Sequence, residues 1–341
     1  MIDIFKDARI LITGGTGSLG HALVYRLLKK HEPKKIIIFS RDEAKQHAMR
    51  VEYQHERAAT DDLMYSNFKQ LVEFRIGDVR DYRSIVQVLR DADIVFNTAA
   101  IKQVPVGEYF PFEAVRTNIG GAENIVSAIC EHDLPVRTVI GISTDKACKP
   151  INAYGMTKAL MERVFIAANI RKPTTRFVLV RYGNVMGSTG SVLPLFKEQI
   201  KNNHPLTITH KDMTRFMMNL NEAVNLIFNA VNEAKPGEIY VPHIKSALMV
   251  DVANAMSAGK EIETEFTGIR PGEKIHELLI SSEEITRTLT RNNELIILPQ
   301  LPELRTTIPG RKVNWMKEYS SQDCIMSFKE LQDALRKEGY L

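Results

Sequence analysis

Two side chains that together can carry out redox chemistry stand one helical turn apart near the middle of the chain. Tyr154 and Lys158 are four positions apart, so in a helix both project from one face. A phenol is a poor base with an ordinary pKa of about 10, and a neighbouring ammonium group stabilises the phenolate and lowers that pKa. The pair therefore predicts acid–base chemistry on a substrate hydroxyl. Because this spacing is common, a pair on a helix surface is the alternative.

A second ionisable pair lies just upstream. Asp145 and Lys146 directly follow Thr144, at the end of an apolar run over 138–144. The oxidation of an alcohol has no need of this extra carboxylate and ammonium. The pair is therefore either a surface salt bridge or the machinery of an additional step.

A glycine-rich turn near the start of the chain predicts a dinucleotide site. Gly14, Gly17 and Gly20 follow an apolar run over 8–13 and open an amphipathic stretch over 18–30. Glycine lets the backbone turn tightly and approach a pyrophosphate, whose charge is favoured by the N–H groups and the dipole at a helix start. A glycine turn without a ligand is the alternative, and the strand before it and the helix after it favour the dinucleotide.

The residues after the second predicted strand, 35–40, indicate which dinucleotide binds. A NAD site usually has an acidic residue there, whereas this chain has Ser40 and Arg41. A hydroxyl and a guanidinium suit a 2′-phosphate, so we expect NADP. Asp42, one position later, keeps NAD as the alternative.

Two further strand ends point to the same ligand. Asp78 and Val79 follow the third predicted strand and would lie beside the adenine. Ala99 and Ala100 follow the fourth, where small side chains would let the cofactor ribose lie against the backbone.

The pattern of apolar and amphipathic segments predicts an α/β fold with a doubly wound, parallel Rossmann sheet. The apolar runs are mostly continuous, as in strands buried on both faces, and amphipathic stretches separate them. After about residue 181 the rhythm changes, which predicts a smaller second lobe. The expected strands are 8–13, 35–40, 72–78, 93–99, 138–144 and 176–181, the expected helices are 18–30, 43–57, 81–90, 113–132, 154–170 and 219–234, and the polar stretch 55–68 is expected to form an extended loop or a helix end.

The composition is that of an ordinary globular protein. The 341 residues are 44% hydrophobic and 25% charged, and no apolar run reaches the length of a membrane span. The first residues also lack the pattern of a signal peptide. Three scattered cysteines argue against a disulfide framework or a metal site, so we expect a reducing cytoplasm and no metal. The net charge of +4 is spread along the chain, so nucleic acid is not an expected partner.

Several longer motifs resemble a known family. TGGTGSLG, NTAA, STDK and YGMTK are similar to motifs of the extended short-chain dehydrogenase/reductases, over roughly residues 5 to 285. Within that family, STDKACKPINAYGMTKALME, RYGNVMGSTGSVLPLF and GIRPGEKIHELLIS resemble the UDP-N-acetylglucosamine 4,6-dehydratases that begin the synthesis of pseudaminic acid and of capsule 6-deoxy sugars.

The resemblance implies a lyase that dehydrates UDP-N-acetylglucosamine at C4–C6 and gives a UDP-2-acetamido-2,6-dideoxy-hexos-4-ulose. Tyr154 and Lys158 would oxidise C4, which acidifies the C5 proton. Lys146, with a pKa lowered by desolvation, would take that proton while Asp145 protonates the departing C6 hydroxyl, and hydride would return to C6. Related dehydratases carry Asp-Glu here, so the Asp-Lys pair implies inversion at C5.

Three alternatives stay open. A UDP-sugar 4-epimerase would keep Tyr154 and Lys158 and have no use for the Asp-Lys pair. An enzyme acting on a 5,6-unsaturated intermediate is a second alternative. A non-catalytic NADP-binding sensor is a third, although such a protein would be expected to lose the four reactive residues.

The resemblance also implies how the chain is organised and which further residues bind ligands. We expect a homo-oligomer that binds a UDP-N-acetylhexosamine, with an NADP-binding domain over 1–181 joined by 217–240, a UDP-sugar lobe over 182–216 and 241–295, and an extension of unknown role over 296–341. In the lobe, loop amides and arginines would bind phosphates and Glu273 would bind the uridine ribose, with an ordinary loop residue as the alternative for each. Thr144 joins the two catalytic pairs; the expected cofactor-binding residues are Gly14, Thr16, Gly17, Ser18, Leu19, Gly20, Ser40, Arg41, Asp42, Lys45, Asp78, Val79, Ala99, Ala100, Lys102, Tyr154, Lys158 and Asn184, and the expected substrate-binding residues are Lys102, Asn184, Ser191, Val192, Thr207, Arg215, Arg270 and Glu273.

Overall fold

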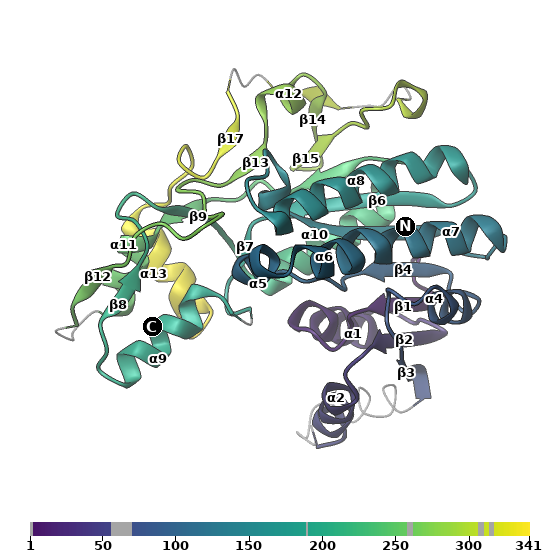
Figure 1. Cartoon of the computed structure of the whole chain (residues 1–341), viewed down its shortest axis with the longest axis horizontal. Helices are drawn as coiled ribbons and strands as arrows, with labels where there is room; N and C mark the ends of the chain where they lie inside the picture. Colours follow the sequence, from purple (N-terminus) through teal and green to yellow (C-terminus); the bar gives the residue numbers. More distant parts are fainter. Residues whose placement is uncertain (1–2, 56–69, 189, 258–261, 306–309, 314–316) are drawn as a thin grey trace.

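The computed structural model describes residues 3–55, 70–188, 190–257, 262–305, 310–313 and 317–341 (Figure 1). The stretch 55–68, expected to be a loop or a helix end, lies outside these residues apart from His55, the last residue of a helix.

A ten-stranded sheet forms the centre of the molecule, in the order β16-β14-β15-β10-β6-β5-β4-β1-β2-β3. The strands from β10 to β3 in this order are parallel, and β15, β14 and β16 are added antiparallel to their neighbours. This confirms the predicted doubly wound parallel sheet. The strands are β1 (Arg9–Thr13), β2 (Lys35–Ser40), β3 (Val72–Ile76), β4 (Ile94–Asn97), β5 (Thr138–Thr144), β6 (Arg176–Tyr182), β10 (Ile239–Val241), β14 (Thr288–Arg291), β15 (Glu294–Ile297) and β16 (Arg311–Lys312).

Helices cover both faces of this sheet because successive strand residues point to opposite sides. Ile10 and Ile12 join the core under one set of helices, and Leu11 joins the core under the other. The first set is α1 (Ser18–Lys30), α2 (Glu43–His55) and α10 (Leu220–Glu233), and the second is α4 (Tyr82–Leu89), α7 (Gly121–Glu131) and α8 (Ala153–Arg171) (Figure 1). The expected helix 113–132 is divided into α6 (Pro111–Ala114), a π-helical stretch η1 (Val115–Gly120) and α7, preceded by α5 (Val104–Tyr109).

A smaller lobe lies beyond the carboxyl ends of the parallel strands (Figure 1). It has its own apolar core, to which Leu331 and Leu335 of the C-terminal helix α13 (Phe328–Lys337) contribute. Its strands are β7 (Asn184–Val185), β8 (Leu206–Ile208), β9 (Thr214–Met218), β11 (Ser246–Leu248) and β12 (Thr264–Phe266), and its other helices are α9 (Val192–Lys201) and α11 (Met249–Met256). Between lobe and sheet lie β13 (Leu278–Ile280), which pairs with β17 (Tyr319–Ser320), and the short helices α12 (Ser282–Ile285) and η2 (Asp145–Ala147). The short helix η3 (Pro302–Leu304) packs against α8.

The two parts of the chain divide differently from the expected ranges. β14 and the first half of β15 fall in the range expected for the lobe, yet both strands extend the main sheet from β10. They do so because their apolar side chains alternate between the two cores of the sheet: Leu289 and Ile296 join one, and Leu295 and Ile297 join the other. In the range 296–341, helix α13 forms one wall of the smaller lobe.

A buried ion cluster fastens β6 to α8 and α12. The Arg181 guanidinium donates two hydrogen bonds to Glu162, at 3.0 and 2.7 Å, and two to Glu284, at 2.7 and 3.0 Å. A fifth bond goes to the Leu279 carbonyl at 2.9 Å. All three charged side chains are less than a tenth exposed. Charges at this depth are tolerated because every donor of the guanidinium is used and both carboxylates share it.

Replacing Arg181 by methionine should strongly destabilise the protein, because two buried carboxylates would lose their ion pair with it and Glu284 would keep the longer one with Arg287, at 3.4 Å. The expected loss in the free energy of unfolding is about 3–5 kcal/mol, measured by urea denaturation. Arg171→Met is the matched control, since Arg171 pairs with Glu123 on the surface and should cost less than about 1 kcal/mol. Equal losses in the two variants would contradict the assignment.

Candidate active site

The glycine turn fits a pyrophosphate. Gly14 has a φ of +66°, and a Cβ there would lie 2.8 Å from the Cα of Ala99, so the turn requires glycine. Helix α1 begins behind it with Gly17 as its N-cap, which offers no side-chain cap, and the first turn has no acidic residue. The N–H groups and the dipole at the start of α1 therefore suit an anion. Thr16, Ser18 and Leu19 are half-buried around this turn, and Gly20 is buried in α1.

The residues after β2 have distinct partners. The Ser40 hydroxyl accepts a hydrogen bond from Gln46 at 3.1 Å. Arg41 is 56% exposed, and its guanidinium lies 3.6 Å from Asp78. The Asp42 carboxylate accepts the backbone N–H of Lys45 at 3.0 Å and so caps α2. Arg41 is thus an exposed cation at this strand end, beside Lys45, which pairs with Asp42 at 3.4 Å, and Arg80, which pairs with Asp78 at 2.6 Å. Asp42 has a structural task of its own.

The segment after β4 is held by Asn118, a residue that the sequence analysis missed. Its side chain exchanges two hydrogen bonds with the backbone of Ile101, at 2.9 and 3.0 Å, and donates a third to Thr157 on α8 at 2.9 Å. Asn118 lies in the π-helical stretch η1, an irregularity that often occurs at functional sites. The segment it fixes includes Ala99, which lies against Gly14, together with Ala100 and the exposed Lys102, while Val79 is buried against Gly121.

Tyr154 and Lys158 lie in the first turns of α8, as predicted, and both are buried. Burial raises the pKa of Tyr154 to about 12, although the Lys146 ammonium and a hydrogen bond with Thr144 act in the opposite direction. Burial lowers the pKa of Lys158 to about 8, and its ammonium donates to the sulfur of Met161 at 3.2 Å. The expectation that Lys158 lowers the pKa of the phenol is therefore wrong for this structure, in which Lys146 is the cation acting on Tyr154.

Asp145 and Lys146 form a three-membered cluster with Glu277, which the sequence analysis also missed. The Lys146 ammonium lies 3.1 Å from a carboxylate oxygen of Asp145 and 3.1 Å from one of Glu277. Gly155, at the start of α8, packs the helix against this turn, since a Cβ there would lie 2.2 Å from the Lys146 carbonyl oxygen. The cluster and Tyr154 therefore share one site.

The charges of the cluster differ from the expected ones. Burial alone would lower the pKa of Lys146, but Asp145 and Glu277 outweigh it, so the pKa is raised rather than lowered. Burial raises the pKa of Asp145, which favours its protonated form. Burial acts the same way on Glu277, but Lys146, Arg215 and Lys274 outweigh it and lower its pKa. The cluster thus places an ammonium between two carboxyl groups whose pKa values are shifted in opposite directions.

Four of the expected substrate residues line one narrow cavity of the smaller lobe. Asn184, Ser191, Val192 and Arg215 meet there, and Arg215 also lies 3.3 Å from Glu273. The side-chain amide oxygen of Asn184 and the Ser191 hydroxyl are buried and have no hydrogen-bond partner within the described part of the chain. Thr207, bonded to Gln199 on α9, and the exposed Arg270 lie outside this cavity.

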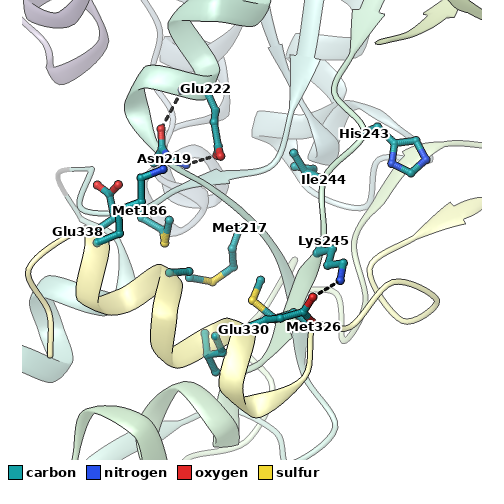
Figure 2. A pocket seen from close by; sticks show the side chains of 13 residues that line it. Met186, Met217, Asn219, Glu222, His243, Ile244, Lys245, Met326, Glu330 and Glu338 are labelled. Atoms are coloured by element: carbon teal, nitrogen blue, oxygen red, sulfur yellow. Dashed lines mark hydrogen bonds and ion pairs between the residues drawn. The ribbon is translucent and has the colours of Figure 1, made fainter. Parts of the chain in front are cut away.

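A neighbouring cavity of about 310 Å³ lies under helix α13. Figure 2 shows the sulfur atoms of Met186, Met217 and Met326 directed toward it, and the ion pair of Lys245 with Glu330 at its edge. Met186 and Met217 also line the first cavity, so two flexible side chains form the wall between them.

Other kinds of site find little support among the residues described. None of the helices there is both long and apolar enough to cross a membrane. Those residues also contain no group of histidine, cysteine and carboxylate side chains arranged to hold a metal ion.

Residues 10–299 match the family model described as polysaccharide biosynthesis protein. The chain belongs to this family. A family relative in Rickettsia typhi, named UDP-glucose 4-epimerase, is 44% identical, with 99% of this chain and 98% of the relative covered. Another, in Campylobacter jejuni, is named UDP-N-acetylglucosamine 4,6-dehydratase (inverting) and is 40% identical over 87% of this chain and 85% of its own.

The fold of this family member matches a solved structure along its whole length. The crystal structure of Pen from Bacillus thuringiensis has a TM-score of 0.89 and 33% identity, and covers 99% of this chain and 100% of its own. Together these matches confirm the resemblance to the extended short-chain dehydrogenase/reductases and to a UDP-N-acetylglucosamine 4,6-dehydratase. The relatives carry the names of two reactions, so the choice between them has to come from the site.

Replacing Lys158 by methionine should stabilise the nucleotide-free protein in a pH-dependent way. The folded state holds the Lys158 proton less tightly than the unfolded chain, whose lysine has its ordinary pKa of 10.5. Wild-type stability should therefore rise with pH between about 8 and 10.5. The variant should gain on the order of 3 kcal/mol below pH 8, and the gain should shrink toward pH 10.5. Urea denaturation across this range measures it, and a gain independent of pH would show that packing alone changed.

Proposed function

We propose that this chain dehydrates UDP-N-acetylglucosamine at C4–C6 with inversion at C5. The observation that carries the proposal is the buried cluster of Asp145, Lys146 and Glu277 beside Tyr154. Of the side chains at this site, oxidation at C4 by a bound nicotinamide dinucleotide would need only Tyr154 and Lys158. A buried carboxyl and a half-buried ammonium next to them suit the two proton transfers of an elimination.

The residues divide the reaction between them. Tyr154 would take the proton of the C4 hydroxyl, and Lys146 would face C5 because it is the exposed member of its cluster, at 19%. Asp145 would give its proton to the C6 oxygen as the C6–O bond breaks and water leaves. A nicotinamide dinucleotide bound at the glycine turn would accept hydride from C4 and return it to C6.

The smaller lobe would hold the nucleotide part of the substrate. Arg215 can pair with a pyrophosphate through its planar fork of donors. The buried oxygens of Asn184 and Ser191 lack partners within the described chain, which suits hydroxyl or amide donors of a ligand. The relatives named for reactions of UDP-sugars support a substrate of this class.

A 4-epimerase is the second candidate, because the relative from Rickettsia typhi carries that name. Epimerisation also begins with oxidation at C4, and then needs only rotation of the 4-keto sugar and return of hydride. It leaves the protons at C5 and C6 in place, and the cluster around Lys146 would have no task.

Incubation with UDP-N-acetylglucosamine should produce a 6-deoxy-4-keto sugar, seen by NMR as a new C6 methyl signal. Lys146→Met should lower its formation by about 10²–10⁴-fold, because the group that faces C5 is lost. This variant should still oxidise C4, more slowly because Lys146 no longer stabilises the Tyr154 phenolate, and accumulate the absorbance of reduced nicotinamide. Tyr154→Phe should show neither signal.

Two outcomes would contradict the proposal. Inversion at C4 without a methyl signal would identify an epimerase. Near-normal turnover of Lys146→Met, with unchanged deuterium uptake from solvent at C5, would reduce the cluster to a structural salt bridge.

We also propose NADP as the cofactor, on the strength of Arg41. Arg41→Asp should weaken NADP binding by about 1.5–3 kcal/mol or more, because a charged hydrogen bond is replaced by a repulsion. Calorimetry on the nucleotide-free protein measures this. Asp81→Asn is the matched control and should change the affinity little, since Asp81 caps α4 and Asn also caps helices. Release of NAD alone from the purified protein would contradict NADP.

A further inference from the structure

Glu277 is a buried carboxylate without a task in the steps above. Its backbone is fixed by Ser321, which accepts the Glu277 N–H at 2.9 Å and donates its own N–H to the Glu277 carbonyl at 2.9 Å. Its side chain is 2% exposed, and one oxygen lies 3.1 Å from the Lys146 ammonium. The other oxygen is buried without a hydrogen-bond partner in the part of the chain described. Glu277 is thus held rigidly behind Lys146.

The three members of the cluster differ in their access to a substrate. Lys146 is 19% exposed, whereas Asp145 and Glu277 are 1% and 2% exposed. A sugar that reaches the cluster would therefore meet Lys146. A charged ammonium has no free electron pair, so Lys146 must first give up a proton before it can take the C5 proton. Its two hydrogen-bonded acceptors are Asp145 and Glu277.

We propose that Glu277 is the net proton acceptor of the elimination and acts through Lys146. This inference rests on the proposed dehydratase function. The Lys146 N–H bond that points at Glu277 breaks and an O–H bond forms on Glu277. The neutral amine then takes the C5 proton, and the electron pair of the C5–H bond enters the enolate. Lys146 ends as an ammonium beside that enolate, so the negative charge has moved from Glu277 to the substrate.

Asp145 is left free for the second proton transfer. Its carboxyl gives a proton to the C6 oxygen, and water departs. The C5 proton is later replaced from Lys146 or solvent, and the proton that Tyr154 took from the C4 hydroxyl balances the one that left in water. The cycle therefore consumes no net proton.

The surroundings of Glu277 tie this transfer to substrate binding. The charged and titratable groups that face it are Lys146, Asp145, Tyr154, Arg215 and Lys274. Arg215 lines the cavity proposed for the pyrophosphate. A bound pyrophosphate would offset the charge of Arg215 and so make Glu277 a better proton acceptor. Proton transfer from Lys146 would then be favoured only with substrate in place.

Glu277→Gln tests the inference, since glutamine keeps the size and can still accept the Lys146 hydrogen bond. With UDP-N-acetylglucosamine in deuterated solvent, deuterium uptake at C5 and methyl formation should both fall by about 10²–10⁴-fold, while reduced nicotinamide still accumulates. Wild-type uptake should fall at acidic pH as Glu277 is protonated. The residual uptake of the variant should instead rise with pH, because Lys146 then has to lose its proton to solvent.

Two further variants separate catalysis from structure. Glu277→Asp keeps a carboxylate and should restore part of the uptake. Glu238→Gln is the matched control: Glu238 is equally buried and pairs with Arg291, but it lies before β10 at the other end of the sheet, and its variant should keep wild-type uptake.

The failure of this inference can be told apart from the failure of the proposed function. A wild-type protein that forms no 6-deoxy product removes the proposed function and this inference with it. If the wild type is active, two results for Glu277→Gln would overturn this inference and leave the proposed function standing. One is deuterium uptake at C5 within about twofold of the wild type. The other is a loss of C4 oxidation as large as the loss of C5 uptake, with a pH profile of uptake unchanged from the wild type.

Discussion

The Arg181 guanidinium is the interaction on which the geometry of the site depends. It joins Glu162, one turn beyond Lys158 on α8, to Glu284, which lies just after β13 and close in sequence to Glu277. Buried charges are stable only when their hydrogen bonds are complete, so α8, β6 and the segment around β13 cannot shift independently. Arg181 thereby fixes α8, which carries Tyr154 and Lys158, relative to β13, which directly follows Glu277, while Gly155 packs α8 against η2.

Two lysines at this site have opposite pKa shifts because of their neighbours. Lys158 is buried with a thioether as its hydrogen-bond acceptor, so desolvation decides and its pKa falls to about 8. Lys146 is also desolvated, but two carboxylates at 3.1 Å decide, and its pKa rises. Environments that shift the pKa values of two lysines in opposite directions allow each lysine a separate proton-transfer role at one pH.

Local patterns were enough to predict much of the fold, and less of the site. The strands over 35–40 and 138–144 and the helix over 18–30 match the structure, because continuous apolar runs and a clear 3.6-residue period leave few alternatives. Glu277 could not be found this way, since its partner Lys146 lies in a distant part of the chain and only the fold brings them together. The prediction that the pKa of Lys146 is lowered was wrong for the same reason. Asp145 is adjacent to Lys146 in sequence, but nothing in the sequence indicates that a second carboxylate, Glu277, lies beside it.

The names of the relatives cannot decide between epimerase and dehydratase, because both reactions begin with the same oxidation at C4. They diverge at C5, where the ketone has made a proton acidic and the site either removes it or leaves it. Removal requires a base within reach and a place for its proton, and it creates an enolate that needs a nearby positive charge. Lys146 between two buried carboxylates offers all three, and an enzyme that only inverts C4 would carry the desolvation cost of that cluster without using it.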